Sequence, residues 1–119
     1  MSQNIKQAVT DENREIEVQN IITYLDEIVR ISKQELIYFA ISSKKCNILE
    51  RIIDVHYVIK EKDSYTFNDD IINHITVPYE NIVEWEFISK DSHDNNYDVD
   101  VLIIRYSNDV EIMMCKNMI

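Results

Sequence analysis

Histidine and cysteine are the residue types in this 119-residue sequence that most readily bind metals or transfer protons. The three histidines, His56, His74 and His93, do not lie three or four positions from one another or from a cysteine, so no local zinc motif is present. Cys46 and Cys115 lack the spacing of a redox or metal motif, and we interpret both as reduced thiols. These residues predict neither a bound metal nor a cofactor.

Two carboxylates, Glu84 and Glu86, could act together. They alternate along a predicted strand, so their side chains should point to the same side, about 7 Å apart. Paired carboxylates can hydrolyse a glycosidic bond, but such an enzyme needs a larger cleft than this domain can build. We therefore interpret them as solvent-facing carboxylates on an amphipathic strand.

The acidic segment 94–100 has the alternate spacing of a calcium loop, with oxygen ligands at Asp94, Asn96, Asp98 and Asp100. The glycine that permits the sharp turn of such a loop is absent, and so is the closing glutamate. A mobile loop with solvated charges explains the segment better than a metal site.

Glycine is absent from the whole sequence. Without it there can be no phosphate-binding P-loop, no Gly-x-Gly-x-x-Gly dinucleotide turn and no Gly-x-Ser-x-Gly nucleophile elbow. Most nucleotide-binding enzyme classes are thereby excluded. We expect a protein that is not an enzyme and has no catalytic residues.

A helix over residues 11–31 is the clearest predicted element, with Thr10 or Asp11 as its cap. Apolar residues follow the helical period at Val18, Ile21, Ile22, Leu25, Ile28 and Val29. Charged residues fall off this stripe at Glu15, Glu17, Asp26, Glu27 and Arg30. The stripe should face the core.

Residues 32–60 fit two interpretations. Ser-Lys-Gln-Glu at 32–35 has the spacing of a capping box and could begin a second helix. The run 36–41 could equally be a buried strand, followed by a turn at 42–45. We favour a strand over 51–60 because its end is β-branched and aromatic.

The last part of the sequence predicts antiparallel β-structure. Val83, Trp85 and Phe87 alternate with acids, and Trp85 should lie in the core. Strands at 101–106 and 110–115 flank Ser-Asn-Asp, a plausible hairpin turn. The predicted fold class is α+β: an N-terminal amphipathic helix, with or without a second short helix, packed on an antiparallel sheet of four to six strands. Residues 1–9 would be a flexible N-terminus and 10–119 a single domain.

Residues 75–82, Ile-Thr-Val-Pro-Tyr-Glu-Asn-Ile, precede a predicted strand and the hairpin 101–115. This succession of strands resembles that of bacterial pleckstrin-homology-like domains over about forty residues. Members of that family usually close their barrel with a C-terminal helix, whereas this sequence stops straight after the last strand.

The sequence has 22 acidic and 12 basic residues, and its net charge is −10. Residues 61–100 hold eleven of the acids against Lys62 and Lys90 alone. This stretch could be a solvated face that keeps the protein soluble. It could also dock on a basic partner, which is typically a protein that itself binds nucleic acid. Phosphates would repel it, which disfavours direct contact with nucleic acid or an anionic membrane.

The leading hypothesis is a small acidic inhibitor that blocks a basic, nucleic-acid-acting protein such as a nuclease. It would be a phage anti-defence protein of the anti-CRISPR type, which imitates nucleic acid, or an immunity protein against a nuclease toxin. The alternative is a non-enzymatic protein-binding scaffold or regulatory module of pleckstrin-homology-like shape, and a homodimer is left open. The predicted partner-binding residues are Asp69, Asp70, Tyr79, Glu80, Glu84, Glu86, Asp91, Asp94, Tyr97, Asp98 and Asp100, with Tyr79 and Tyr97 as exposed anchors.

The sequence also bears on location. No apolar run approaches the roughly 20 residues that span a bilayer, and residues 1–7 lack the apolar core of a secretion signal. We therefore expect a cytoplasmic protein.

Overall fold

The computed structural model describes residues 4–31, 36–69, 72–92 and 98–116, with the backbone alone at 46–48. Within these residues the chain forms nine strands and one helix. In chain order they are β1 (Asn4–Ala8), α1 (Arg14–Ile31), β2 (Leu36–Ser43), β3 (Cys46–Asp54), β4 (Tyr57–Lys60), β5 (Ser64–Asn68), β6 (His74–Pro78), β7 (Ile82–Ile88), β8 (Val101–Tyr106) and β9 (Glu111–Lys116). The described chain contains no helix that is both long enough and apolar enough to cross a membrane.

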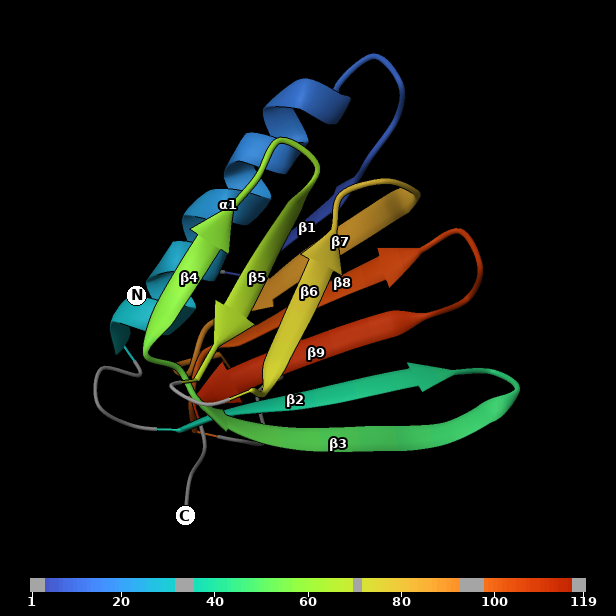
Figure 1. Ribbon diagram of the computed structural model, residues 1–119. Helices are drawn as coiled ribbons and strands as arrows, with labels where there is room; N and C mark the ends of the chain where they lie inside the picture. Colours follow the sequence, from blue (N-terminus) through green and yellow to red (C-terminus); the bar gives the residue numbers. More distant parts are fainter. Residues whose placement is uncertain (1–3, 32–35, 70–71, 93–97, 117–119) are drawn as a thin grey trace.

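The strands form two antiparallel sheets. One has six strands in the order β1-β7-β8-β9-β2-β3, and the other has three in the order β4-β5-β6. The helix and the three-stranded sheet cover the same face of the six-stranded sheet (Figure 1). Aromatic contacts join the layers. The ring centroids of Tyr24 in α1 and Trp85 in β7 are 5.2 Å apart, and those of Phe39 in β2 and Phe67 in β5 are 5.0 Å apart. One apolar core therefore lies between the large sheet and its two covers.

The predicted helical stripe is confirmed. Ile21, Leu25 and Ile28 are fully buried, and the rest of the stripe packs against the core. Thr10 and Asn13 exchange hydrogen bonds, with Thr10 N 2.7 Å from Asn13 Oδ1 and Asn13 N 3.3 Å from Thr10 Oγ1. This reciprocal arrangement caps the helix at Thr10, as in a capping box.

The predicted α+β fold class is wrong, because the described chain is mostly β and its helix follows a strand. Residues 4–8, expected to be flexible, form β1 at the edge of the large sheet, where they pair with 84–88 of β7. An edge strand has one neighbour and little to bury; only Ile5 of β1 packs against the core, so β1 shows no apolar alternation. The assignment of 10–119 to a single domain stays a prediction.

The region that the sequence left ambiguous is also β. Residues 36–43 form a strand, whereas the predicted capping box at 32–35 lies outside the described residues. The strand expected over 51–60 is interrupted after Asp54, and its two parts belong to different sheets. Similarly, the stretch 75–82, on which the pleckstrin-homology-like resemblance rests, begins in β6 of the small sheet and ends at Ile82, the first residue of β7 in the large one.

The predicted hairpin of β8 and β9 is confirmed, with Asp109 in its turn at a φ of 67°. Asn81 lies between β6 and β7 at a φ of 68°, and Asp98 has a φ of 59°. Asparagine and aspartate tolerate the left-handed region better than other residues with a Cβ atom. They therefore occupy these three left-handed positions in a chain without glycine.

Candidate ligand-binding groove

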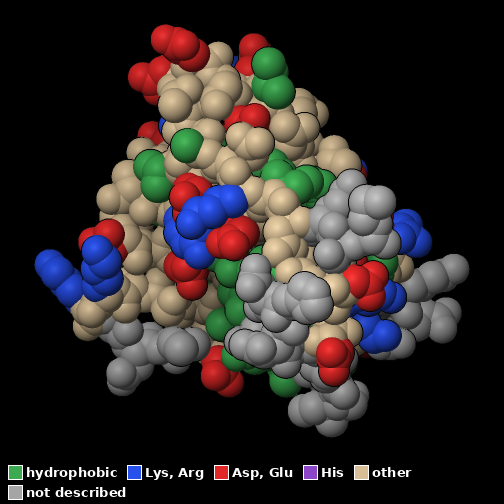
Figure 2. Space-filling view, turned by 180° about the vertical axis from the view of Figure 1, so that it is seen from behind, with side chains coloured by type: hydrophobic (Ala, Val, Ile, Leu, Met, Phe, Trp, Pro, Cys, Tyr) green, Lys and Arg blue, Asp and Glu red, His purple; other side chains and the backbone are tan. Residues whose placement is uncertain are grey.

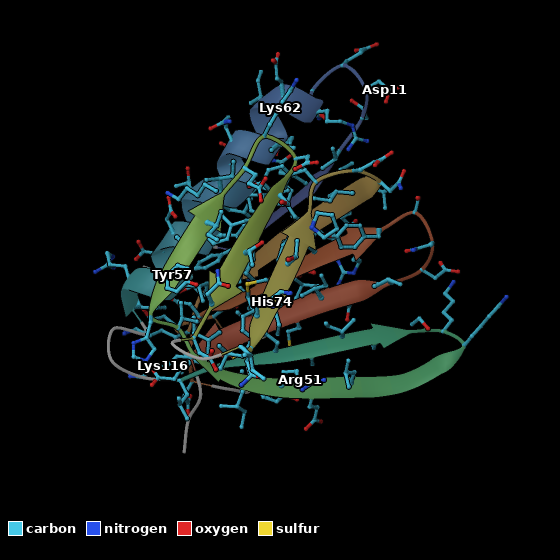
Figure 3. All side chains as sticks on the ribbon, viewed as in Figure 1. Asp11, Arg51, Tyr57, Lys62, His74 and Lys116 are labelled. Carbon is cyan, nitrogen blue, oxygen red and sulfur yellow. The ribbon has the colours of Figure 1, made fainter. Side chains whose placement is uncertain are left out.

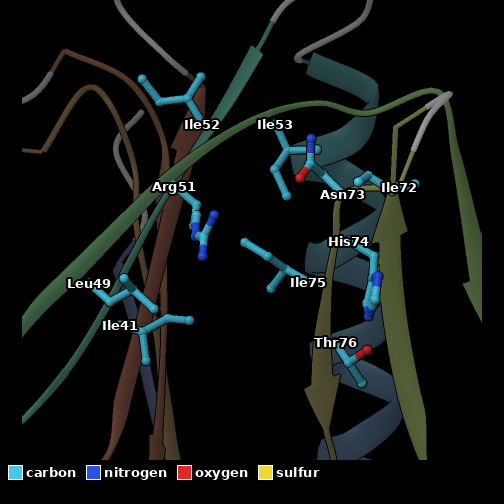
Figure 4. Close-up of a pocket in the computed structure, with 10 residues that line it drawn as sticks. All are labelled: Ile41, Leu49, Arg51, Ile52, Ile53, Ile72, Asn73, His74, Ile75 and Thr76. Carbon is cyan, nitrogen blue, oxygen red and sulfur yellow. The ribbon is translucent and has the colours of Figure 1, made fainter.

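The candidate site is a groove between the open edges of the two sheets. β3 is the last strand of the six-stranded sheet and β6 the last of the three-stranded sheet. Figure 3 labels one residue from each strand, Arg51 and His74. The groove has a volume of about 420 Å³. Its lining residues are Ile41, Leu49, Arg51, Ile52, Ile53, Ile72, Asn73, His74, Ile75 and Thr76 (Figure 4).

The strand registers explain why the groove is apolar. In an antiparallel pair, residues directly opposite each other share a face. Ile53, Arg51 and Leu49 of β3 lie opposite Ile37, Phe39 and Ile41 of β2, which places all six on the inner face of the large sheet. The groove is therefore a continuation of the core beyond the point where the small sheet covers it.

Burial falls off from the floor of the groove to its rim. Ile53 and Ile75 are 4% and 7% exposed, so they belong to the core. Leu49 is 51% exposed and Ile72 is 81% exposed, although both are large apolar residues. The groove is thus an open depression with an apolar floor and exposed apolar walls, which suits a ligand with an extended apolar surface.

His74 contributes the imidazole of the groove. It is exposed at the start of β6 and lies on the β6 side of the groove, near Thr76 (Figure 4). Asp69 fixes the backbone immediately before it, since its carboxylate accepts hydrogen bonds from Asn73 N at 3.0 Å and Asn73 Nδ2 at 2.9 Å. The His74 ring has no hydrogen-bonding partner within the part of the chain that the structure describes. By contrast, His56 lies outside the groove lining, and its Nε2 is 3.1 Å from a carboxylate oxygen of Asp54.

Arg51 contributes a positive charge. In Figure 4 its guanidinium extends into the groove from β3, and Ile75 extends toward it from β6. Arg51 is exposed and has no ion pair or hydrogen bond among the described residues. The inner side of the groove can therefore offer an apolar surface and a guanidinium to a ligand, while His74, which alternates with the inward-pointing Ile75, places its imidazole at the outer rim of β6.

The structure brings two of the predicted partner-binding residues together. Glu84 and Glu86 lie on the same face, as expected, but both bind Arg105, with Glu86 Oε1 3.0 Å from Arg105 Nη2. Glu111 accepts a third bond from Arg105, at 2.9 Å. Figure 2 shows such a group of acidic and basic side chains on the face of the large sheet opposite α1. These glutamates are therefore paired rather than free to meet a basic partner.

The remaining predicted partner-binding residues do not form one surface in the structure. Tyr79 is 6% exposed and belongs to the core, so it is not an exposed anchor. Glu80 and Asp91 are exposed in separate turns, while Asp100 accepts a bond from the Lys90 amide. Asp69 is engaged with Asn73, and Asp98 is exposed. The predicted residues Asp70, Asp94 and Tyr97 lie outside the described residues, as do Asn96 and His93.

The cysteines do not contribute to the groove. Cys115 is a free, buried thiol whose pKa is raised by burial, and the side chain of Cys46 lies outside the described part. Among the residues that the structure describes, no group of three or more His, Cys, Asp or Glu side chains could hold a metal ion on its own.

Comparisons with known proteins find structures with a similar fold but assign the chain to no family. No protein-family model and no curated protein matches the sequence. Solved structures do match. The chain aligns with the heme-binding protein ChuX at a TM-score of 0.54 and 8% sequence identity, covering 93% of this chain and 62% of ChuX. A protein of Erwinia carotovora matches at a TM-score of 0.55 and 10% identity, covering 93% of this chain and 62% of that protein. A protein of Agrobacterium tumefaciens matches at 0.54 and 8%, covering 92% and 57%.

This likeness shows the fold alone, because the sequences are at most 10% identical. The chain spans about three fifths of the length of the solved structures that it matches. The comparison nevertheless overturns the inhibitor hypothesis. The neighbours include a protein described as heme-binding, and the predicted partner-binding residues form no common surface, so the hypothesis of a basic, nucleic-acid-acting partner is wrong. The anti-CRISPR and immunity settings and the scaffold alternative are withdrawn with it.

The sequence did not reveal the groove, because its residues come from β2, β3, β6 and the two residues before β6, and they meet only after two sheets have formed. A local motif for such a site does not exist. The one available signal was that apolar side chains occur on both faces of the strand 48–53. A strand with only one covered face needs apolar residues on that face alone.

Proposed function

We propose that this chain binds heme in the groove between β3 and β6. The observation that carries the proposal is an apolar groove with a single imidazole, that of His74, among its lining residues. The volume of about 420 Å³ falls within the range of small-molecule sites, about 300–1,000 Å³. The likeness of the fold to that of a heme-binding protein supports the same ligand.

The residues of the groove fit heme in their chemistry. Ile41, Ile53 and Ile75 would contact the apolar macrocycle, and His74, at the outer rim of the groove, would hold the iron. When bound, heme supplies an iron centre that an imidazole nitrogen can ligate. The His74 ring is available for this because no described residue binds it.

Hemin titration followed by visible absorbance tests the proposal. We expect the wild-type protein to bind one hemin with a shift of the Soret band. His74→Ala should weaken binding about tenfold or more, equivalent to about 1.4 kcal/mol, and should change the position of the band. His56→Ala is the matched control, because it removes an exposed imidazole outside the groove and should leave binding unchanged. The proposal fails if the wild type binds no hemin, or if the two variants behave alike.

A second pair of variants locates the ligand independently of the imidazole. Leu49→Glu places a carboxylate on the groove wall, and Ile16→Glu places one on an exposed position of α1. Both side chains are more than half exposed, so neither change should disturb folding. We expect Leu49→Glu alone to weaken hemin binding. Equal affinities for the two variants would mean that hemin binds elsewhere or without specificity.

Two further expectations from the sequence remain proposals. One is that the chain is not an enzyme, which holds if the loaded protein neither degrades heme nor turns it over in the presence of a reductant. The other is a cytoplasmic location, which fractionation of the producing cells would test.

A further inference from the structure

Arg51 is one of several described cations of this acidic chain for which the structure shows no ion pair. The described Lys and Arg residues with an ion pair to a carboxylate are Lys6, Arg30, Lys44, Lys60 and Arg105. Arg51 has none among the described residues, although the sequence offers 22 acids to 12 Lys and Arg residues. Of the four arginines, Arg30 and Arg105 pair with carboxylates, Arg14 and Arg51 pair with none that the structure describes, and only Arg51 lines the groove.

The register of β3 explains why no carboxylate reaches Arg51. Its cross-strand neighbour on the inner face is Phe39, and its neighbours along the same face of β3 are Leu49 and Ile53. Glu50 points to the opposite face, since successive residues of a strand alternate. The guanidinium therefore faces an apolar groove, where its donors can be satisfied only by water or by a ligand.

We infer that the groove selects ligands that carry a carboxylate on an apolar body, with Arg51 as the residue that binds the carboxylate. This inference rests on the proposed function, because the propionate groups of heme are such carboxylates. A guanidinium suits the role, since its planar fork binds both oxygens of one carboxylate. The groove would then recognise the free carboxylates of the porphyrin, and this recognition would not depend on the iron that His74 would hold.

The test separates the carboxylate from the iron by using metal-free porphyrins. Protoporphyrin IX and its dimethyl ester have the same macrocycle, but only the first has free carboxylates. Binding of each is measured by porphyrin fluorescence, for the wild type, Arg51→Gln and the control Lys62→Gln. Lys62 lies in the turn between β4 and β5, well away from Arg51 (Figure 3), so its removal changes the net charge without changing the groove.

For the free acid, Arg51→Gln should lose about tenfold in affinity, as expected for a hydrogen-bonded charge pair that the bound ligand shields from water. Lys62→Gln should lose nothing measurable. For the dimethyl ester, the wild type and Arg51→Gln should bind equally, both at the weaker level. His74→Ala should bind both metal-free porphyrins like the wild type. Arg51→Lys should recover part of the affinity, because it restores the charge without the planar fork.

The inference is wrong if the wild type binds the ester as tightly as the free acid, or if Arg51→Gln weakens both equally. Either result leaves the proposed function standing, provided that hemin still binds. If the wild type binds no porphyrin at all, the proposed function fails first. Urea unfolding of each variant checks that the fold is kept, and we expect no loss of it because all three changed residues are exposed.

Discussion

The buried carboxylate of Glu17 provides a sharp test of the packing between α1 and the large sheet. Glu17 is 8% exposed, and its Oε1 accepts a hydrogen bond at 2.8 Å from Nε1 of Trp85, which is 1% exposed. Glu17→Leu removes the acceptor and leaves the indole N–H buried without a partner. A buried, unsatisfied donor costs about 1–3 kcal/mol. Removing a desolvated carboxylate offsets part of that loss. We therefore expect the free energy of unfolding to fall by about 2 kcal/mol.

Glu15→Leu is the matched control for this change. Both glutamates lie in the first turn of α1, so each loses the same favourable interaction with the helix dipole, about 0.3–1 kcal/mol. Glu15 is exposed and makes no contact with Trp85 among the described residues. The difference between the two variants therefore reports the bond to the indole together with the longer bond, 3.4 Å, that Asn20 Nδ2 donates to Glu17 Oε1. Glu17→Gln should restore much of the lost stability, because its amide oxygen can still accept from Trp85.

The assay is urea unfolding at pH 7, followed by far-UV circular dichroism and by the fluorescence of Trp85, the single tryptophan of the chain. The urea concentration at the midpoint should fall, while the dependence of the free energy of unfolding on urea stays constant, because the surface exposed on unfolding does not change. In a thermal scan, about 2 kcal/mol corresponds to roughly 6–8 °C for a chain of this size. If Glu17→Leu is no less stable than Glu15→Leu, the indole bond contributes nothing and our account of this contact is wrong.

Two further predictions concern the charged cluster and the buried phenols. Arg105→Met leaves the carboxylates of Glu84, Glu86 and Glu111 without their shared cation; after solvent screening we expect a loss of about 1–2 kcal/mol at pH 7. Urea unfolding measures this loss of stability. Arg30→Met, the control, breaks an exposed pair with Glu27 and should have little effect. Equal losses for the two variants would contradict the prediction. Burial raises the pKa of Tyr65, with a further contribution from its hydrogen bond to Asp26, and burial also raises the pKa of Tyr106. Because the unfolded chain releases these protons near pH 10 and the native protein does not, stability should fall as the pH rises above about 10. Tyrosinate absorbance should then increase together with the loss of circular dichroism. If Tyr65 and Tyr106 ionised near pH 10 while the circular dichroism stayed native, the prediction would be wrong.

The parts of the fold that the sequence predicted are those governed by local patterns. The apolar period of residues 18–29 was sufficient to predict a buried helix face, and β8 and β9 were evident from two β-rich runs around an Asn-Asp turn. Where the pattern is not local, the prediction failed. β1 has no apolar period because its role is edge pairing, and Glu17 was assigned off the stripe although it lies against Trp85.

The charge argument failed for a related reason. Counting acids along residues 61–100 ignores cations from elsewhere in the chain, and Arg105 lies outside that stretch. The pairing of β7 with β8 places Arg105 directly opposite Glu84 and beside Glu86. Much of the apparent acidic surface of β7 is thus neutralised within the sheet, by a contact that only the register of the strands reveals.

The groove follows from the unequal sizes of the two sheets. Three strands and one helix cannot cover the whole inner face of six strands, and the uncovered part falls at β3, an edge strand that lies away from α1 (Figure 1). On β2, Ile37 and Phe39 are fully buried, whereas Leu49, opposite Ile41 on β3, is 51% exposed. This gradient marks the line at which the cover ends. Apolar side chains beyond that line do not contribute their full burial to folding, since half of that surface stays in water. Their contribution is realised when another apolar body lies on them, which is why we assign binding, rather than stability, to this end of the sheet.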